Sequence, residues 1–254
     1  MPSSGRIRVA AVPYVGRSET EKSALKSRVT VVSIVDAVAA SLREKLFDGV
    51  LIGNSTLTEA DVAAMYDVAR PTAKSAIQQL VSEGLFLRDA HKTARVPSMG
   101  PDDVRDLLFS RTCIESGVVR ELARRCAVPA AAQESNRIVY SFVGHSDFDA
   151  IAPVVDFHLG LVRSLGSERV QRIFSGLMSE MRLCMVQMHH RRQLDMNLIA
   201  EEHDAILASI AGGDPDAAAQ AMSDHLAKAL DRILRTVEAP PDSMSGQDPA
   251  KADQ

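Results

Sequence analysis

Residues 57–88 read LTEADVAAMYDVARPTAKSAIQQLVSEGLFLR, and this stretch decides the fold of the N-terminal part of the chain. Thr58 and Asp61 form a capping-box-like start, which predicts a helix over 58–66. Apolar residues at helical spacing predict a second helix from Arg70 to Glu83, and Gly84 suits the left-handed residue that ends it. Two short helices joined by a tight turn are a common way to lay a helix in a DNA major groove. The stretch therefore predicts a helix-turn-helix.

The sequence on either side completes a winged helix-turn-helix. Upstream, apolar residues recur at helical spacing from Ile34 to Phe47 and the run stops at Gly49, which predicts a first helix. Downstream, residues 85–88 and 94–97 have the pattern of two short strands joined by a polar turn. Such a hairpin can reach a neighbouring groove or phosphate. We therefore expect residues 31–98 to form a winged helix-turn-helix DNA-binding domain.

The rest of the chain has helical periodicity without strand alternation. Helices are predicted near 102–126, 129–143, 148–166, 168–192, 195–212 and 215–238. They predict an antiparallel all-α bundle of about six helices over residues 99–238, so the expected fold class is mainly α. Residues 1–30 are expected to be a disordered basic arm, either an uncommitted tail or an aid to DNA binding. Residues 239–254, rich in Pro, Asp and Ser, are expected to be a disordered tail.

Composition narrows the class of protein. The chain has 254 residues, 46% of them hydrophobic, which is enough for two modest cores. Its uncharged apolar runs fall far short of the roughly 20 residues that a bilayer needs, so we expect no membrane segment and no signal peptide. Three scattered cysteines, Cys113, Cys126 and Cys184, favour core thiols in a reducing compartment and hence a cytoplasmic protein. Because the net charge is −4, any affinity for DNA must come from where the basic side chains lie.

Candidate DNA contacts lie on the exposed face of the second helix of the helix-turn-helix. The residues are Arg70, Thr72, Lys74, Ser75 and Gln78, with Lys92 in the wing turn as a further candidate. These residue types bond phosphates and base edges. A winged helix can also serve as a protein-docking module with the same core, and the pattern alone leaves that alternative open.

Residues 31–97 resemble the DNA-binding domain of the GntR family of bacterial transcription regulators. The motifs are Gly-x-Leu-x-Gly from Gly49, Leu-Thr-Glu-x-Asp-Val-Ala from Leu57, Val-x-Arg ending at Arg70, and Leu-x-x-Glu-Gly-Leu from Leu80. The chain departs from the family at Ala69, which removes a phosphate-binding hydroxyl, and at Lys74, which replaces a forked guanidinium with a point charge. The resemblance implies operator binding, with an operator that need not resemble a typical one.

Three histidines interrupt apolar helical stripes in the C-terminal part. On their helical stripes, His158 lies with Val155 and Val162, His203 lies between Ile199 and Ile206, and His225 lies beside the stripe of Met222 and Leu226. Three predicted helices thus each direct an imidazole toward one interior. A single inward histidine is more often a core residue, but neutral imidazoles gathered in a bundle core are common ligands for zinc, nickel and similar ions. We expect these three residues to share a metal site.

Residues 102–235 resemble the all-helical, FCD-like effector domain of the FadR-type branch of the same family. The matching segments are Asp156-Phe157-His158, Glu202-His203-Asp204-Ala205-Ile206 and Met222-Ser223-Asp224-His225-Leu226. The resemblance implies an ion held by three histidines and an acid one turn before the first, often together with a carboxylate effector. Here Val154 stands in the acid's place, and Asp156 should face away because it lies about 200° around the helix from His158. A metal-assisted effector site and a site that has lost its ion both remain open.

Two arginines are candidate effector contacts. Arg111 and Glu115 interrupt an apolar helix face one turn apart, either as an intrahelical ion pair at the rim or with Arg111 forked onto a carboxylate effector. The position of Arg111 also matches the family's Arg-x-x-x-Glu on this helix. Arg182, beside a methionine-rich helix face, is a second candidate.

These patterns together predict a ligand-responsive transcription regulator that binds double-stranded operator DNA as a homodimer and is not an enzyme. Repression, rather than activation, is the habit of the family. The alternative is a metal-dependent, hydrolase-like enzyme that uses the three-histidine site to activate water. Against it, we expect Glu202, next to His203, to point elsewhere, which would leave no general base at the site.

Overall fold

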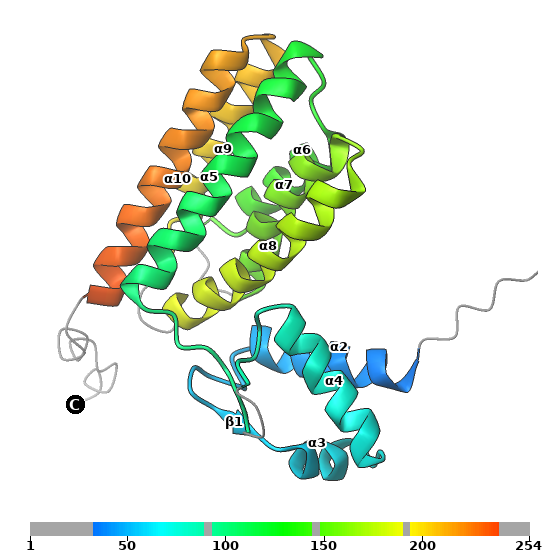
Figure 1. Cartoon of the computed structure of the whole chain (residues 1–254). Coiled ribbons are helices and arrows are strands. Elements are labelled where there is room, and N and C mark those ends of the chain that lie inside the picture. Colours follow the sequence, from blue (N-terminus) through cyan, green and yellow to red (C-terminus); the bar gives the residue numbers. More distant parts are fainter. Residues whose placement is uncertain (1–32, 89–92, 144–147, 190–193, 239–254) are drawn as a thin grey trace, which may run out of the picture. The chain divides into compact units, whose positions relative to one another are not determined.

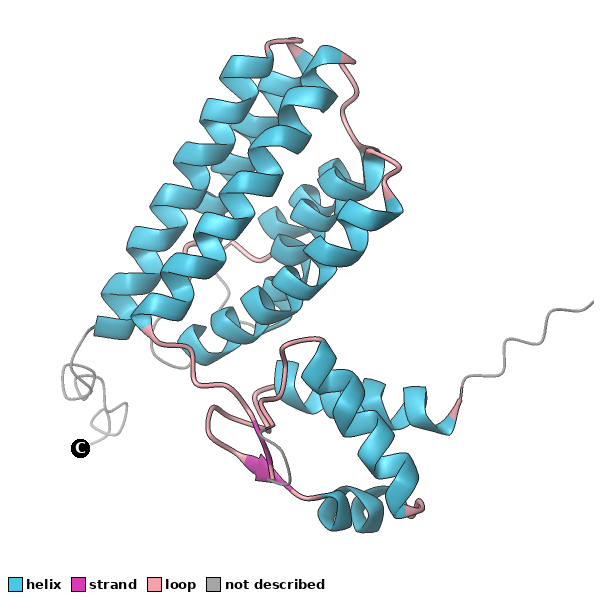
Figure 2. Ribbon diagram, in the orientation of Figure 1, coloured by secondary structure: helices cyan, strands magenta, loops and turns pink. Residues whose placement is uncertain are grey.

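The computed structural model describes residues 33–88, 93–143, 148–189 and 194–238 (Figure 1). The expected arm at 1–30, the tail at 239–254 and Lys92 in the wing turn lie outside the described residues. Helices make up most of the described chain, with one small sheet (Figure 2). The prediction of a mainly α protein with a winged helix-turn-helix is confirmed.

The N-terminal helices follow the predicted capping signals. They are α2 (Ile34–Phe47), α3 (Glu59–Tyr66) and α4 (Arg70–Ser82). At the start of α3, Thr58 Oγ1 accepts from the Asp61 backbone N–H, and Asp61 Oδ2 accepts from the Thr58 backbone N–H. The α3–α4 turn begins at Asp67 with a φ of 50°, and Gly84 follows α4 with a φ of 75°. These left-handed residues reverse the chain at each helix end.

The sheet differs from the expected hairpin. Strand β1 (Thr56–Leu57) pairs antiparallel with β2 (Ala94–Arg95), and residues 85–88 contribute only a bridge between Leu87 and Arg95. Residues 56–57 were not predicted as a strand because two residues are too few to show alternation. Leu57 and Ala94 are buried in the domain core with side chains of the three helices. The pairing therefore closes the sheet over that core.

The C-terminal domain consists of six α-helices, counted over the described residues, and one 3-10 turn. They are α5 (Pro101–Arg124), α6 (Ala130–Ser141), η1 (Phe148–Ala150), α7 (Ile151–Ser164), α8 (Glu168–His189), α9 (Met196–Ala211) and α10 (Pro215–Glu238). Within this domain α10 packs along α5, α6 along α7, and α9 against both α6 and α10. Among the described helices, none combines the length and apolar character that a membrane span requires.

Close packing of α6 on α7 prepares the site. A Cβ added at Gly160 of α7 would lie 3.0 Å from the backbone nitrogen of Ala132 in α6. That distance is too short for an ordinary side chain, so glycine at this position allows the two backbones to approach. Residues of α6 thereby reach the interior, where α7, α9 and α10 meet.

Candidate functional site

Three imidazoles converge in the core of the C-terminal domain. His158 comes from α7, His203 from α9 and His225 from α10, and each side chain is buried. One ring nitrogen of each lies within 4.8 Å of the others, and the Nε2 atoms of His158 and His225 are 3.3 Å apart. The His203 ring stacks on Phe157, which fixes its plane. Sequence periodicity thus predicted a real cluster.

The Nδ1 atom of each imidazole lies within hydrogen-bonding distance of a side-chain oxygen. His158 Nδ1 lies 2.5 Å from Glu115 Oε2, and His225 Nδ1 lies 2.8 Å from Glu202 Oε2. His203 Nδ1 lies 3.0 Å from Asn136 Oδ1. Histidines that bind metals usually donate their other ring N–H to such an acceptor, which fixes the tautomer and the ring orientation. With Nδ1 as the donor in all three rings, each Nε2 carries a lone pair toward the shared centre.

Burial keeps the three rings in the neutral form. It lowers the pKa of His158 and of His203 well below 6.5, and nearby Arg111 acts in the same direction. Burial also lowers the pKa of His225, although the hydrogen bond to Glu202 opposes this. Neutral imidazole is the form that binds a metal ion.

The spacing of two of the three donors fits a divalent ion. Two nitrogens bound to one tetrahedral zinc at about 2.0–2.1 Å are about 3.3–3.4 Å apart, the separation found between His158 and His225. Without an ion or a proton between them, two lone pairs at that distance would repel. His203 Nε2 is buried and has no hydrogen-bond partner among the described residues. These three residues can therefore hold a metal ion.

Both acids behind the histidines are also paired with arginines. Arg111 Nε donates to Glu115 Oε1 at 2.8 Å, and both side chains are at least 97% buried. The predicted intrahelical pair therefore exists, but in the interior and not at the rim. Burial raises the pKa of Glu115, and the Arg111 guanidinium opposes that rise.

Glu202 corrects an expectation from the sequence. It does not point away from the site, because its carboxylate lies against His225 and accepts two hydrogen bonds from Arg232 of α10. Burial raises the pKa of Glu202, but the hydrogen bonds from His225 and Arg232 outweigh it and lower the pKa to about 2. A carboxylate engaged in this way orients His225 and is a poor general base.

A narrow cavity of about 40 Å³ adjoins His158 and His225, whereas His203 is not among its lining residues. It is lined by Arg111, Val154, His158, Met181, Met185, Met188, Leu194, Ile199, His225, Ala229, Arg232 and Ile233. Arg111 Nη2 is buried there without a hydrogen-bond partner among the described residues. Val154 lines the cavity, whereas Asp156 is exposed on α7. Arg182, the second predicted effector contact, is not among the lining residues.

The predicted DNA-contact residues on α4 lie on one accessible face. Arg70, Lys74, Ser75 and Gln78 are exposed, and Thr72 is half-buried. Arg70 is the first residue of α4, after an N-cap, Ala69, that has no side chain to satisfy the helix amides. Pro71 has no N–H and the Thr72 N–H donates to the Ala69 carbonyl, so a phosphate here would be bound by the exposed side chains and not by helix amides. The opposite face of α4 packs into the domain core through Ala73, Ile77 and Leu80.

Comparison with protein families identifies both domains. The bacterial regulatory protein family named gntR matches residues 34–96, and the FCD domain matches residues 106–228. The chain belongs to the GntR family of transcription regulators. This GntR regulator thus pairs a DNA-binding helix-turn-helix with an FCD effector-binding domain. The family consists of regulators and not enzymes, so the hydrolase alternative is set aside.

Relatives of this GntR regulator extend over both domains. The uncharacterized HTH-type regulator BphR of Paraburkholderia xenovorans is 26% identical over 78% of this chain and 84% of its own. An Escherichia coli protein, provisionally named an L-lactate dehydrogenase operon regulatory protein, is 24% identical over 76% and 82%.

Solved structures share its fold at lower identity. Escherichia coli McbR/YncC aligns with a TM-score of 0.68 and 17% identity, covering 81% of this chain and 99% of that one. A GntR-type protein from Rhodococcus sp. RHA1 aligns with a TM-score of 0.63 and 23% identity, covering 80% and 98%. These likenesses concern the fold alone.

Two residues behind the cluster escaped prediction, although the sequence carries a signal for each. Arg232 lies seven residues after His225, which is two helical turns along the same face of α10. Asn136 lies on the buried stripe of α6 between Ala132 and Val139. A polar residue within an apolar stripe was the signal that singled out the histidines, and it applies to both.

Proposed function

We propose that this GntR regulator represses transcription as a homodimer on operator DNA until a small carboxylate enters its FCD domain. In this proposal residues 31–98 read the operator, and residues 99–238 bind the effector with a divalent ion such as zinc or nickel. The proposal is carried by the convergence of one ring nitrogen from each of the three histidines and by Arg111 Nη2, which has no hydrogen-bond partner among the described residues and belongs to the cavity that His158 and His225 line. The homodimer is supported by the resemblance to the FadR-type branch and by the two half-sites that paired recognition helices read. Repression is supported by that resemblance alone.

The charges around the cavity favour an anion. Arg111 balances Glu115, and Arg232 balances Glu202, so these pairs leave no net charge. An ion held by three neutral imidazoles would bring a double positive charge, and Val154 offers no carboxylate to balance it. When bound, such an ion would polarise and hold a carboxylate oxygen as a Lewis acid. Arg111 Nη2 can donate a charge-assisted hydrogen bond to the same group.

The walls of the cavity favour a small ligand with an apolar body. A cavity of about 40 Å³ has room for only a few atoms by the measure in which one water needs about 10–15 Å³. Away from the arginines and histidines, its lining is aliphatic and rich in methionine, a flexible side chain that adapts to varied shapes. A short monocarboxylate fits this chemistry better than a sugar acid or a tricarboxylate. The name of the Escherichia coli relative refers to lactate, itself a small carboxylate.

An acid-versus-amide comparison tests the ligand class. With zinc present, acetate, propionate and butyrate should raise the melting temperature, whereas the corresponding amides should not, because only the acids supply charge. Arg111→Lys should reduce the shift while keeping the charge next to Glu115. Alanine at this position is a poor test because an unpaired buried Glu115 would cost about 3–5 kcal/mol. Equal shifts from acids and amides, measured by differential scanning fluorimetry, would contradict the anion site.

Val154→Asp should supply the acidic ligand that the family resemblance implies one turn before His158. We expect zinc affinity to rise by more than the roughly 10–100-fold that an orienting partner contributes, because the acid would bind the ion directly. The carboxylate-induced shift in melting temperature should shrink because the ion's charge is then balanced within the protein. Competition against a chromophoric chelator measures the first effect. As a control, Asp156→Ala removes an exposed acid from the same helix and should change neither the zinc affinity nor the carboxylate-induced shift. Unchanged zinc affinity in Val154→Asp would show that a side chain at position 154 does not reach the ion.

Regulation is tested by adding the ligand to the DNA complex. A ligand changes DNA affinity only to the extent that it binds the DNA-bound and free states differently. In a gel-shift titration with DNA from the regulator's own upstream region, zinc with butyrate should weaken binding, whereas zinc with butyramide should not. Tighter binding with the acid would reverse the proposed direction of control.

A further inference from the structure

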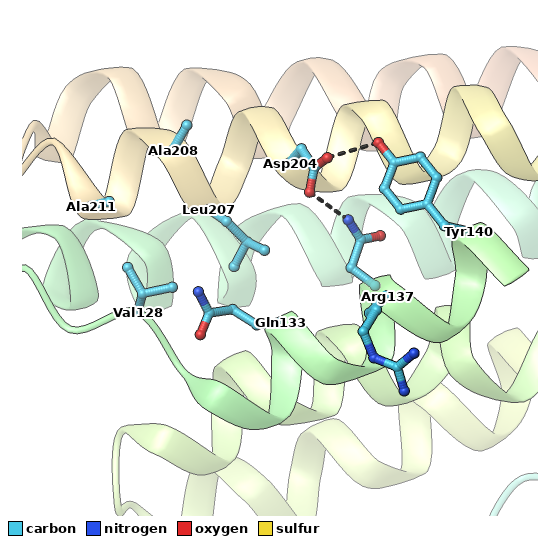
Figure 3. A pocket seen from close by; sticks show the side chains of 9 residues that line it. Val128, Gln133, Arg137, Tyr140, Asp204, Leu207, Ala208 and Ala211 are labelled. Atoms are coloured by element: carbon cyan, nitrogen blue, oxygen red, sulfur yellow. Dashed lines mark hydrogen bonds between the residues drawn. The ribbon is translucent and has the colours of Figure 1, made fainter.

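A hydrogen-bonded chain runs from the outer face of the FCD domain to His203. Tyr140 Oη donates to Asp204 Oδ2 at 2.7 Å, and Asn136 Nδ2 donates to Asp204 Oδ1 at 2.7 Å. Asn136 Oδ1 then lies 3.0 Å from His203 Nδ1. Figure 3 shows Tyr140 of α6 and Asp204 of α9 directed toward each other beside a groove lined by Leu207 and Ala208. The chain therefore joins exposed residues to a fully buried imidazole.

The partners of Asn136 leave its amide only one orientation. Its Nδ2 faces two groups that only accept hydrogen bonds, the Asp204 carboxylate and the Ala200 carbonyl at 3.1 Å. Turning the amide over would place its oxygen against both acceptors and its NH₂ against His203. Tyr140 remains a donor to Asp204, since the hydrogen bond to that carboxylate raises its pKa to about 12.

The fixed amide in turn determines which nitrogen of His203 carries the proton. An oxygen facing Nδ1 requires an N–H there, so Nε2 is left with a lone pair. That lone pair is the one directed into the cluster, and it is buried without a hydrogen-bond partner among the described residues. The other two histidines obtain the same orientation from glutamates that are paired with arginines, whereas His203 obtains it from a neutral amide.

We propose that Asn136, held by Asp204, is the positioning residue that keeps His203 in the tautomer able to bind the metal ion. This inference rests on the metal site of the proposed function. It assigns the exposed Asp204 a part in metal affinity, although Asp204 reaches the imidazole only through Asn136. Loss of the amide should allow His203 to adopt either tautomer. The affinity for the ion should then fall although no ligand is removed.

The test compares three variants in the full chain. Asn136→Leu, close in size and without hydrogen-bonding groups, should lower zinc affinity by about 10–100-fold, the usual effect of losing such a partner. Asp204→Ala removes the exposed acid that holds the amide but leaves Asn136 in place, so it should lower zinc affinity by less than Asn136→Leu does. Gln133→Leu, an exposed change on the same helix and in the same groove, is the matched control and should have no effect.

Two readouts separate this inference from the proposed function. Nitrogen-15 NMR of the metal-free protein should show His203 as a single tautomer with Nε2 unprotonated, and Asn136→Leu should give both tautomers. Competition with a chromophoric chelator gives the zinc affinities. A wild-type protein that binds no zinc would overturn the metal site, yet the tautomer would still decide the role of Asn136. A single unchanged tautomer in a folded Asn136→Leu, or a zinc affinity of Asn136→Leu equal to that of the Gln133→Leu control, would overturn the positioning role.

Discussion

Replacing His203 with glutamine should abolish the stabilisation that zinc gives the protein. One of three ligands is lost from a site that has no protein acid to compensate, so the drop in zinc affinity should exceed the roughly 10–100-fold cost of losing an outer partner. Glutamine keeps much of the side-chain volume against Phe157, and it is preferable to alanine because His203 is fully buried. In zinc at about 100 times the dissociation constant, the wild-type protein should gain about 2.7 kcal/mol.

Thermal melts with and without zinc, together with metal analysis after dialysis, measure this effect. Asp224→Ala is the control: it removes an exposed acid next to His225 that bonds only Gln220 among the described residues. It should behave as the wild type. Equal metal content in His203→Gln and in the wild type would rule out His203 as a ligand.

Arg70→Ala should weaken operator binding by about 1–3 kcal/mol if its guanidinium reads a base, which is about 5- to 150-fold in Kd. Combining it with Lys74→Ala should lower affinity further and flatten the salt dependence. Each phosphate contact that is lost lowers the number of counterions released when the protein binds DNA. Both side chains are exposed at the start of α4, so neither change should disturb the core.

Gel-shift titrations at several salt concentrations separate base reading from phosphate contact. Arg137→Ala removes the same charge from an exposed position of the FCD domain and serves as the control. If Arg70→Ala binds as tightly as the control at every salt concentration, the reading surface lies elsewhere in the domain.

Sequence periodicity predicted the parts of the site that each helix determines by itself. His158, His203 and His225 each lie on an apolar stripe, and a stripe faces the core whatever helix packs against it. The helix bounds were also within reach, because proline and glycine mark most of the breaks. Even the conclusion that Asp156 faces outward needed only the helical repeat.

What the sequence did not predict depends on contacts between distant helices. Glu202 turns inward because its carboxylate forms hydrogen bonds with Arg232 and His225 of α10. Nothing in the sequence of α9 indicates these two partners. The bond between Glu115 and His158 likewise joins residues 43 positions apart. Burial of the Arg111–Glu115 pair follows from the packing of other helices over α5, which a single-helix pattern cannot reveal.

The separation of the three histidines along the chain has a consequence for the lifetime of the protein. His158 and His225 are 67 residues apart, so an unfolded chain does not bring them together, and an ion that binds them selects the folded domain. Metal starvation would then increase the fraction of molecules open to proteases. Cellular abundance of the regulator, and not only its occupancy of DNA, would follow the supply of the ion.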